Sequence, residues 1–392
     1  MSAYLHALGV TCSLGHGKAA VAHALFEGSP HGLYARDGWV PRRALPVSEV
    51  SAPLPGVPEG LEHRDTRNHR LLTEAVGEIG AEVAAAIARF GAHRIGVVIG
   101  TSNTGIEEAT DHIAAHGRDG AWPGGYRYNG QELGAPAAFI AQWLGLGGPC
   151  HGLSTACTSG ARALITARRL LRLDLCDAVI CGGADTLCRL ATHGFHALEA
   201  MADERCQPFA AARSGIHIGE AAAVFLMTRE PGPVTFSGSG ASSDAYHMSS
   251  PEPDGRGASE AMRAALACAG LDATSIDYVN LHGTATEHND AMESHAMQAV
   301  FGNGVPCSST KWLTGHTLGA AGALEAAFCW LSLTDPERRL PPHPHGHAID
   351  PALAPLAFVA AGDRLPPGRR HVMSNSFAFG GNNASLVFSH TA

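Results

Sequence analysis

Lysine is almost absent from this chain: Lys18 and Lys311 are the only lysines among its 27 basic residues. Acidic residues also outnumber basic ones, 36 to 27, so the formal net charge is −9. This charge argues against a general nucleic-acid-binding protein. Long hydrophobic runs are missing as well. No segment approaches the roughly 18 consecutive apolar residues of a membrane-spanning helix, so we expect no stable insertion into a membrane.

Paired cysteine motifs are lacking too. The ten cysteines show no CxxC spacing and no pattern typical of a disulfide framework. The first residues, MSAYLH, hold neither the basic region nor the apolar stretch of a secretory leader, so we expect reduced thiols and a cytoplasmic protein. With 45% hydrophobic and 16% charged residues over 392 positions, the chain is suited to a large buried core.

Short apolar strands alternate with helical segments along the chain. The strands are expected at 4–10, 95–100, 177–183, 234–238, 276–281 and 384–388, and the helices at 71–90, 161–173, 259–269 and 319–333. Such an alternation indicates an α/β fold with a buried sheet. The pattern breaks near residues 229–233 and then starts again in a similar order. We therefore predict two related halves, residues 1–232 and 233–392.

Cys157 lies in a turn of small residues, STACTSG (154–160), which leads into the helix expected at 161–173. Unpaired N–H groups and the dipole at a helix N-terminus favour a thiolate, so this position suits a nucleophile. Cysteine is also one of the most frequently buried residue types, and the local sequence alone leaves a packed structural thiol open.

Two of the 23 histidines stand at junctions between expected elements and beside glycines. His282 opens HGTAT directly after a strand, and His316 lies in GHTLGAAG before a helix. Lys311 precedes His316 in the same loop, and a glycine-rich loop, NSFAFGGNN (375–383), comes before the last strand. Open α/β sheets bind ligands at such junctions, so these motifs are candidates for a functional site.

Taken in this order, STACTSG, HGTAT, the run from Lys311 to Gly322 and the FGGNN loop resemble the elongating β-ketoacyl-acyl-carrier-protein synthases of the thiolase-like superfamily. The resemblance covers nearly the whole chain and implies a five-layered αβαβα fold of two similar halves. It implies a decarboxylative condensation of malonyl-acyl carrier protein with an enzyme-bound acyl group, which extends the chain by two carbons in fatty-acid, polyketide or polyene biosynthesis. In detail the chain resembles ketosynthases of aryl polyene pathways.

The resemblance also assigns roles to the motif residues. Cys157 matches the nucleophile that accepts the acyl group, and the backbone N–H groups of Cys157 and Phe379 match an oxyanion hole. His282 and His316 match the pair that holds the malonyl thioester oxygen during decarboxylation. Phe379 matches the gating phenylalanine. The family implies no metal and no redox cofactor, since the substrates arrive on the phosphopantetheine arm of acyl carrier protein.

Six further residues match supporting positions of the family. They are the catalytic pair Lys311 and Glu325, the arm-binding threonines Thr284 and Thr286, and the expected acyl-pocket residues Phe195 and Ile106. A purely structural ion pair is the alternative for Lys311 and Glu325, and simple core packing is the alternative for Phe379.

Acyl carrier protein is the implied partner, together with a second subunit in a homodimer or in a heterodimer with a chain-length-factor-like chain. Carrier proteins are acidic and so is this chain, so docking needs a local basic patch. Arg64, Arg67 and Arg70 are spaced by three, which is typical of one helix face, and are our carrier-docking candidates. A solvated surface stripe is an equally open interpretation.

Two positions depart from the family pattern. Ala378 replaces a glycine of the gating loop, and Glu287 replaces the proline that commonly follows HGTAT. These departures bear on substrate choice rather than on the nucleophile. Two alternatives with the same fold remain: a non-catalytic chain length factor, which would lack the cysteine, and a thiolase, which would need a second cysteine where this chain has Phe379.

Three alternating histidines, His343, His345 and His347, stand in a stretch rich in proline and glycine. A metal site is conceivable there, but the prolines and the lack of nearby cysteine or carboxylate ligands favour an exposed loop.

Overall fold

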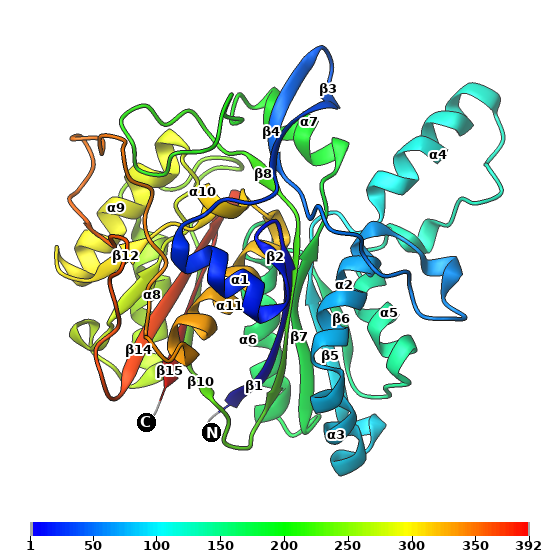
Figure 1. Cartoon of the computed structure of the whole chain (residues 1–392), viewed down its shortest axis with the longest axis horizontal. Coiled ribbons are helices and arrows are strands. Elements are labelled where there is room, and N and C mark those ends of the chain that lie inside the picture. Colours follow the sequence, from blue (N-terminus) through cyan, green and yellow to red (C-terminus); the bar gives the residue numbers. More distant parts are fainter. Residues whose placement is uncertain (1–2, 391–392) are drawn as a thin grey trace.

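The computed structural model describes residues 3–390, and its centre is a 12-stranded mixed sheet (Figure 1). A second sheet has three strands, β3, β4 and β8. The strands are β1 (Ala3–Cys12), β2 (Gly15–His16), β3 (Leu33–Val40), β4 (Arg43–Ser48), β5 (Ile95–Gly100), β6 (Cys150–Leu153), β7 (Ala178–Asp185), β8 (Ile218–Gly219), β9 (Ala221–Thr228), β10 (Val234–Ser243), β11 (Tyr278–Asn280), β12 (Pro306–Ser308), β13 (Ala357–Phe358), β14 (Arg370–Ala378) and β15 (Asn382–His390).

The strand order repeats in the two halves of the large sheet. It is β1-β9-β7-β5-β6 in the first half and β10-β15-β14-β11-β12 in the second. In each half the first two pairings are antiparallel and the next two are parallel. The halves meet where β1 pairs with β10, and the division expected at residues 232 and 233 falls in the turn between β9 and β10. The prediction of two similar halves is confirmed.

The helices form three layers around the two halves of the sheet. They are α1 (Gly17–Glu27), α2 (Arg67–Glu78), α3 (Gly80–Phe90), α4 (Ile106–Asp119), α5 (Ala135–Leu144), α6 (Ser159–Arg172), α7 (Arg189–Ala197), α8 (Arg256–Ala269), α9 (Glu287–Phe301), α10 (Lys311–Thr314) and α11 (Ala321–Thr334). Helices α6 and α11 pack on each other between the two halves, α2 and α5 cover the first half, and α8 with α9 covers the second (Figure 1). This is the expected αβαβα arrangement.

Three apolar cores hold these layers together. The central one includes side chains of β1, α6 and α11, such as Leu5, Leu164 and Phe328. An outer core under α2 and α5 includes Leu71, and another under α8 and α9 includes Met262. Because α6 and α11 are buried on nearly all sides, the loops that precede these two helices are fixed relative to each other.

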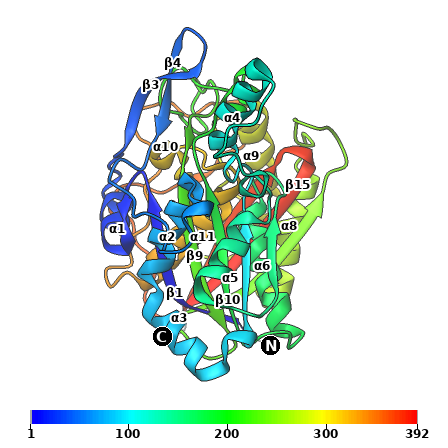
Figure 2. The same ribbon diagram turned by 90° about the vertical axis from the view of Figure 1, so that its right-hand side faces the viewer.

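Some elements differ from the sequence prediction. The helix expected at 71–90 is two helices, α2 and α3, because Ile79 leaves the helical conformation between them. The strand expected at 276–281 is shorter, at Tyr278–Asn280. A β3–β4 hairpin that the sequence analysis did not anticipate extends beyond the main body in both views (Figures 1 and 2). Within residues 3–390, every helix is too short or too polar to cross a membrane.

Candidate active site

Cys157 lies in the turn between β6 and α6, two residues before the helix begins. Small polar side chains close this turn: Ser159 Oγ donates to the carbonyl of Ala156 at 2.6 Å, and Thr158 Oγ1 donates to the carbonyl of Thr155 at 2.8 Å. These bonds explain why the turn is made of serine, threonine and alanine. Larger side chains would not fit, since a Cβ on Gly160 would lie 2.6 Å from the backbone nitrogen of Ala323 in α11.

Each of the three candidate catalytic loops contains a non-glycine residue in the left-handed region. Ala156, directly before Cys157, has φ of 53°, Ala285 in the HGTAT loop has φ of 65°, and Leu318, two residues after His316, has φ of 51°. Such conformations cost about 1–3 kcal/mol each and persist only where the surroundings enforce them. Backbone strain of this kind is typical of functional loops.

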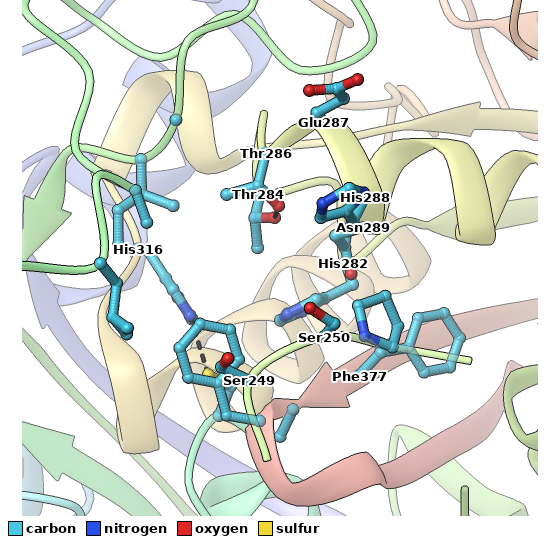
Figure 3. A pocket seen from close by; sticks show the side chains of 18 of the residues that line it. Ser249, Ser250, His282, Thr284, Thr286, Glu287, His288, Asn289, His316 and Phe377 are labelled. Carbon is cyan, nitrogen blue, oxygen red and sulfur yellow. Dashed lines mark hydrogen bonds between the residues drawn. The ribbon is translucent and has the colours of Figure 1, made fainter. Parts of the chain in front are cut away.

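The three loops bring Cys157, His282 and His316 together in the lining of one cavity of about 490 Å³. Figure 3 shows the two histidines among the side chains that line it. The His316 Nε2 atom lies 3.0 Å from the Cys157 sulfur, and the centroids of the two imidazole rings are 5.5 Å apart. All three side chains are buried. Thr284, Thr286, Phe195, Ala378 and Phe379 line the same cavity, where the sequence analysis placed them.

Burial dominates the electrostatics of Cys157. It raises the pKa of the thiol to about 11, although the Lys311 ammonium and the backbone N–H groups of Phe379 and Cys157 act in the opposite direction. At this sulfur, burial therefore outweighs the effect of the groups that favour a thiolate. The proton must instead pass to a neighbouring base, and His316 Nε2 is within hydrogen-bond distance.

We predict that alkylation of Cys157 by iodoacetamide accelerates about tenfold per pH unit between pH 7 and pH 10, because the thiolate fraction rises tenfold per unit below the pKa. Peptide mass spectrometry would measure the rate at this residue alone. Cys268 is the internal control, since it is exposed and its pKa is lowered. A rate at Cys157 that is already constant at pH 8 would show a preformed thiolate and contradict this assignment.

Lys311 fixes the hydrogen-bonding state of His282. Its Nζ atom lies 3.3 Å from His282 Nδ1, and it is ion-paired with the buried carboxylate of Glu325. An ammonium donates to Nδ1, so the ring proton of neutral His282 is on Nε2, the other ring nitrogen. Burial first, and the Lys311 charge second, hold the pKa values of His282 and His316 well below the usual range, which keeps both rings neutral.

The same geometry bears on metal binding. Cys157, His282 and His316 offer one ligand atom each, and these atoms lie within 4.8 Å of one another. A metal ion would need the lone pair of His282 Nε2, but the Lys311 ammonium places the proton there. His282 is therefore better suited to donate a hydrogen bond to a substrate oxygen than to ligate a metal.

We predict that Lys311→Met lowers the free energy of unfolding by about 3–5 kcal/mol, because it leaves the Glu325 carboxyl buried without its partner. Burial already raises the pKa of Glu325 to about 7. The double variant Lys311→Met/Glu325→Leu should regain much of this stability but no activity, since His282 Nδ1 still lacks its donor. Urea unfolding measures the difference, and a double variant no more stable than Lys311→Met would contradict the argument.

Two carboxylates that the sequence analysis missed hold the HGTAT loop. Glu293 of α9 accepts the N–H groups of His282 at 2.8 Å and Gly283 at 2.7 Å. Asp290 accepts the N–H group of Ala285 at 3.1 Å. Both residues lie in the first two turns of α9, which begins at Glu287 directly after HGTAT. A helix predicted at this position would have placed their side chains near the HGTAT loop.

The structure places four of the predicted site residues differently from the sequence pattern. Ile106 begins helix α4 and is not among the residues that line the cavity with Cys157. Arg64 lies in a short 3-10 turn, whereas Arg67 and Arg70 belong to α2, so the three arginines do not share one helix face. Arg67 Nε donates to the buried Glu220 at 2.8 Å, and Arg70 Nε donates to Asp65 at 2.6 Å. Arg67 and Arg70 thus have carboxylate partners within the chain, and the carrier-docking role of the three arginines stays a prediction.

Two smaller expectations are also settled by the geometry. His343 is buried and stacks on Phe358 at a centroid distance of 3.9 Å, so only His345 and His347 fit the exposed loop that was expected. Ala378 has an extended conformation that any residue adopts, so its methyl group adds no backbone strain. The loop's left-handed residues are Gly380 and Gly381.

Comparison with known proteins identifies the family. Residues 52–231 match the N-terminal domain model of β-ketoacyl synthases, and residues 234–347 match the C-terminal domain model. The chain belongs to the β-ketoacyl synthase family. It is therefore a member of a family of condensing acyltransferases, and the resemblance inferred from the motifs is confirmed.

The ketosynthase ApeO of Xenorhabdus doucetiae, solved in complex with its chain length factor ApeC, is 44% identical with a TM-score of 0.94, and the match covers 100% of this chain and 98% of that one. Nodulation protein E of Rhizobium meliloti is 35% identical over 65% of each chain. The 3-oxoacyl-[acyl-carrier-protein] synthase 2 of Staphylococcus aureus is 34% identical over 62% of this chain and 64% of its own. The chain thus matches slightly less than two thirds of the length of these two curated relatives.

Proposed function

We propose that this protein is an elongating 3-oxoacyl-[acyl-carrier-protein] synthase that condenses malonyl-acyl carrier protein with an acyl group held on Cys157. The observation that carries the proposal is the convergence of one thiol and two neutral imidazoles, buried within 4.8 Å of one another, in the lining of a single cavity. Two loops of the second half and one loop of the first half supply them.

In the first half-reaction, the Cys157 thiol passes its proton to His316 Nε2 and attacks the thioester carbonyl of the acyl carrier. The oxyanion is stabilised by the backbone N–H groups of Cys157 and Phe379, which already face the sulfur. The intermediate collapses to an acyl-Cys157 thioester. The carrier thiol leaves with the proton returned by His316.

In the second half-reaction, malonyl carrier enters past Thr284 and Thr286, whose hydroxyls face the cavity. His282 Nε2–H donates a hydrogen bond to the malonyl thioester oxygen, and His316 donates a second one after its ring proton has moved from Nδ1 to Nε2, so carbon dioxide leaves and an enolate remains. The enolate carbon attacks the acyl-Cys157 carbonyl and displaces the sulfur. The product is a 3-oxoacyl carrier two carbons longer. Decarboxylation itself supplies the carbanion, so the proposed reaction uses no metal and no redox cofactor.

A reconstitution assay tests the proposal. Purified protein is mixed with acyl carrier protein and malonyl carrier, and mass spectrometry of the phosphopantetheine arm is expected to show the 3-oxoacyl product. Release of carbon dioxide without an acyl donor, but no product with one, would count against condensation. Absence of both activities with any acyl chain and any added subunit would remove the proposal.

The two alternative functions are less well supported by the site. A chain length factor has no use for a cysteine in contact with histidine, and here all three catalytic side chains are present and buried together. A thiolase would need a second cysteine in the cavity. Among residues 3–390, Cys157 is the only cysteine that lines it, and Phe379 occupies the corresponding loop.

The partner subunit proposed here is a second chain of the chain-length-factor type, as in the ApeO complex. Strand β6 forms an edge of the sheet and its residues Cys150 and His151 are exposed. Helix α4 projects from the body (Figure 1), and the segment that follows it exposes Trp122 and Tyr128. An uncovered edge strand and exposed aromatic rings are both suited to contact with another subunit. Co-expression followed by native mass spectrometry distinguishes a heterodimer from a homodimer.

We also propose a cytoplasmic location and a specialised pathway of the aryl polyene type. The lack of paired-cysteine spacing in the sequence and the need for acyl carrier protein support the location. The similarity to ApeO over the full chain supports a pathway that employs a chain length factor.

A further inference from the structure

Asp185 is a buried carboxylate at the end of β7 to which the proposed mechanism gives no role. Three residues of the loop after β5 donate hydrogen bonds to it. Thr101 Oγ1 lies 2.7 Å from one carboxylate oxygen, Ser102 donates its N–H at 2.8 Å and its hydroxyl at 2.6 Å, and Asn103 donates its N–H at 3.1 Å. All of these donors belong to the first half of the chain.

One further donor comes from the second half. The Gly319 N–H group lies 2.6 Å from the other oxygen of Asp185. Gly319 is three residues beyond His316, and a Cβ at this glycine would lie 2.7 Å from both Asp185 Oδ2 and the Ser102 nitrogen. Between them, Leu318 has the left-handed φ of 51°. The carboxylate therefore fixes the strained turn that follows His316.

The His316 ring depends on its backbone for orientation. No group in residues 3–390 hydrogen-bonds to its Nδ1 atom, whereas His282 Nδ1 faces Lys311. On one side, the His316 N–H donates to the carbonyl of His217 at 2.8 Å. On the other side, the His316 carbonyl accepts from the Gly219 N–H group at 3.1 Å, and the next polar attachment to the first half is the Gly319–Asp185 bond. These three attachments hold the backbone from which the His316 ring reaches the Cys157 sulfur.

We propose that Asp185 is a positioning residue for His316, which acts by holding the Leu318–Gly319 turn against the first half of the protein. The proposal rests on the function given above, because it assigns His316 a part in catalysis. Cys157 follows β6, and Asp185 ends β7 in the same half of the sheet. The hydrogen bonds to Asp185, called the Asp185 clamp below, therefore hold the His316 loop against the half of the protein that carries the nucleophile.

The test compares two variants of the same hydrogen-bond cluster. Asp185→Asn keeps the volume, but its amide cannot accept from Gly319 and from the Ser102–Asn103 loop at the same time. We expect kcat for malonyl-carrier decarboxylation to fall about 10- to 100-fold, with KM changed less than about twofold. The matched control is Thr101→Val, which removes one donor to Asp185 but leaves Gly319 bonded. Its kcat should stay within about 1.5-fold of wild type, although it too loses a buried hydrogen bond.

Two readouts separate positioning from a loss of fold. Thermal unfolding ranks the stability of both variants, and iodoacetamide alkylation at pH 8 reports the contact between Cys157 and His316. Positioning predicts slower alkylation in Asp185→Asn alone. A kcat that falls equally in both variants, or one that is unchanged in Asp185→Asn, overturns the proposal. Wild-type enzyme is run alongside: inactive wild type rejects the proposed function, whereas active wild type with an equally active Asp185→Asn rejects only the positioning role.

Ser102→Ala keeps the proposal testable if Asp185→Asn does not fold. It removes a hydroxyl donor to the same oxygen that accepts from Gly319 and leaves the charge in place. We expect decarboxylation to slow about threefold, corresponding to a partly released clamp. A rate equal to that of wild type overturns the proposal.

Discussion

Cys157→Ala is expected to abolish condensation, with a loss of about 10⁴-fold or more, because Cys157 is the only cysteine among residues 3–390 that lines the cavity and the acyl-enzyme cannot form without its thiol. Mass spectrometry after incubation with acyl carrier protein should show the acyl adduct on Cys157 of the wild type and no adduct on the variant. Product formation by the carrier assay gives the rate.

A suitable control is Cys12→Ala. Cys12 in β1 is equally buried, and burial raises its pKa to about 12, but it does not line the cavity. It should lose some stability and keep both adduct and product. If Cys157→Ala still elongates acyl chains, the nucleophile has been assigned wrongly.

Replacing the two histidines by alanine is expected to slow different steps of the reaction. His282→Ala should form the acyl adduct at a rate close to that of the wild type but slow malonyl decarboxylation about 10²- to 10³-fold, the usual effect of losing one oxyanion donor. His316→Ala should slow both steps, because its Nε2 atom also contacts the Cys157 sulfur at 3.0 Å. The motifs alone gave the two residues the same role, and the geometry separates them.

Pre-steady-state acylation and carbon dioxide release measure the two steps independently. Both variants should remain folded, since each removes a ring that lines an existing cavity. Equal acylation rates in the two variants would contradict the assignment of acylation to His316 alone. Normal decarboxylation in His282→Ala would contradict the proposed role of His282 as a hydrogen-bond donor.

The sequence predicts this site well where chemistry and backbone shape demand the same residues. Cys157, His282 and His316 each stand beside glycine, alanine or serine, because the loops approach other backbone closely and leave no room for larger side chains. Such motifs are local, so they can be read without coordinates. The repeated strand order was also visible, as each half restarts with an apolar strand and a helix.

The sequence fails where the deciding partner is remote. Arg67 resembles part of a free basic stripe until Glu220, 153 residues away, is placed against it. Asp185 and Glu293 belong to no motif, and their importance follows from the N–H groups that folding brings to them. The break between α2 and α3 at Ile79 is a change in backbone angles at one residue, and the apolar periodicity continues across it.

The matching strand order shows how the two halves divide the site residues between them. Cys157 lies between β6 and α6, and His316 lies between β12 and α11, so the two residues occupy equivalent places in the repeat. Two identical copies would present either two sulfurs or two imidazoles to each other. The proposed chemistry therefore depends on the difference between the two halves, and neither half can substitute for the other.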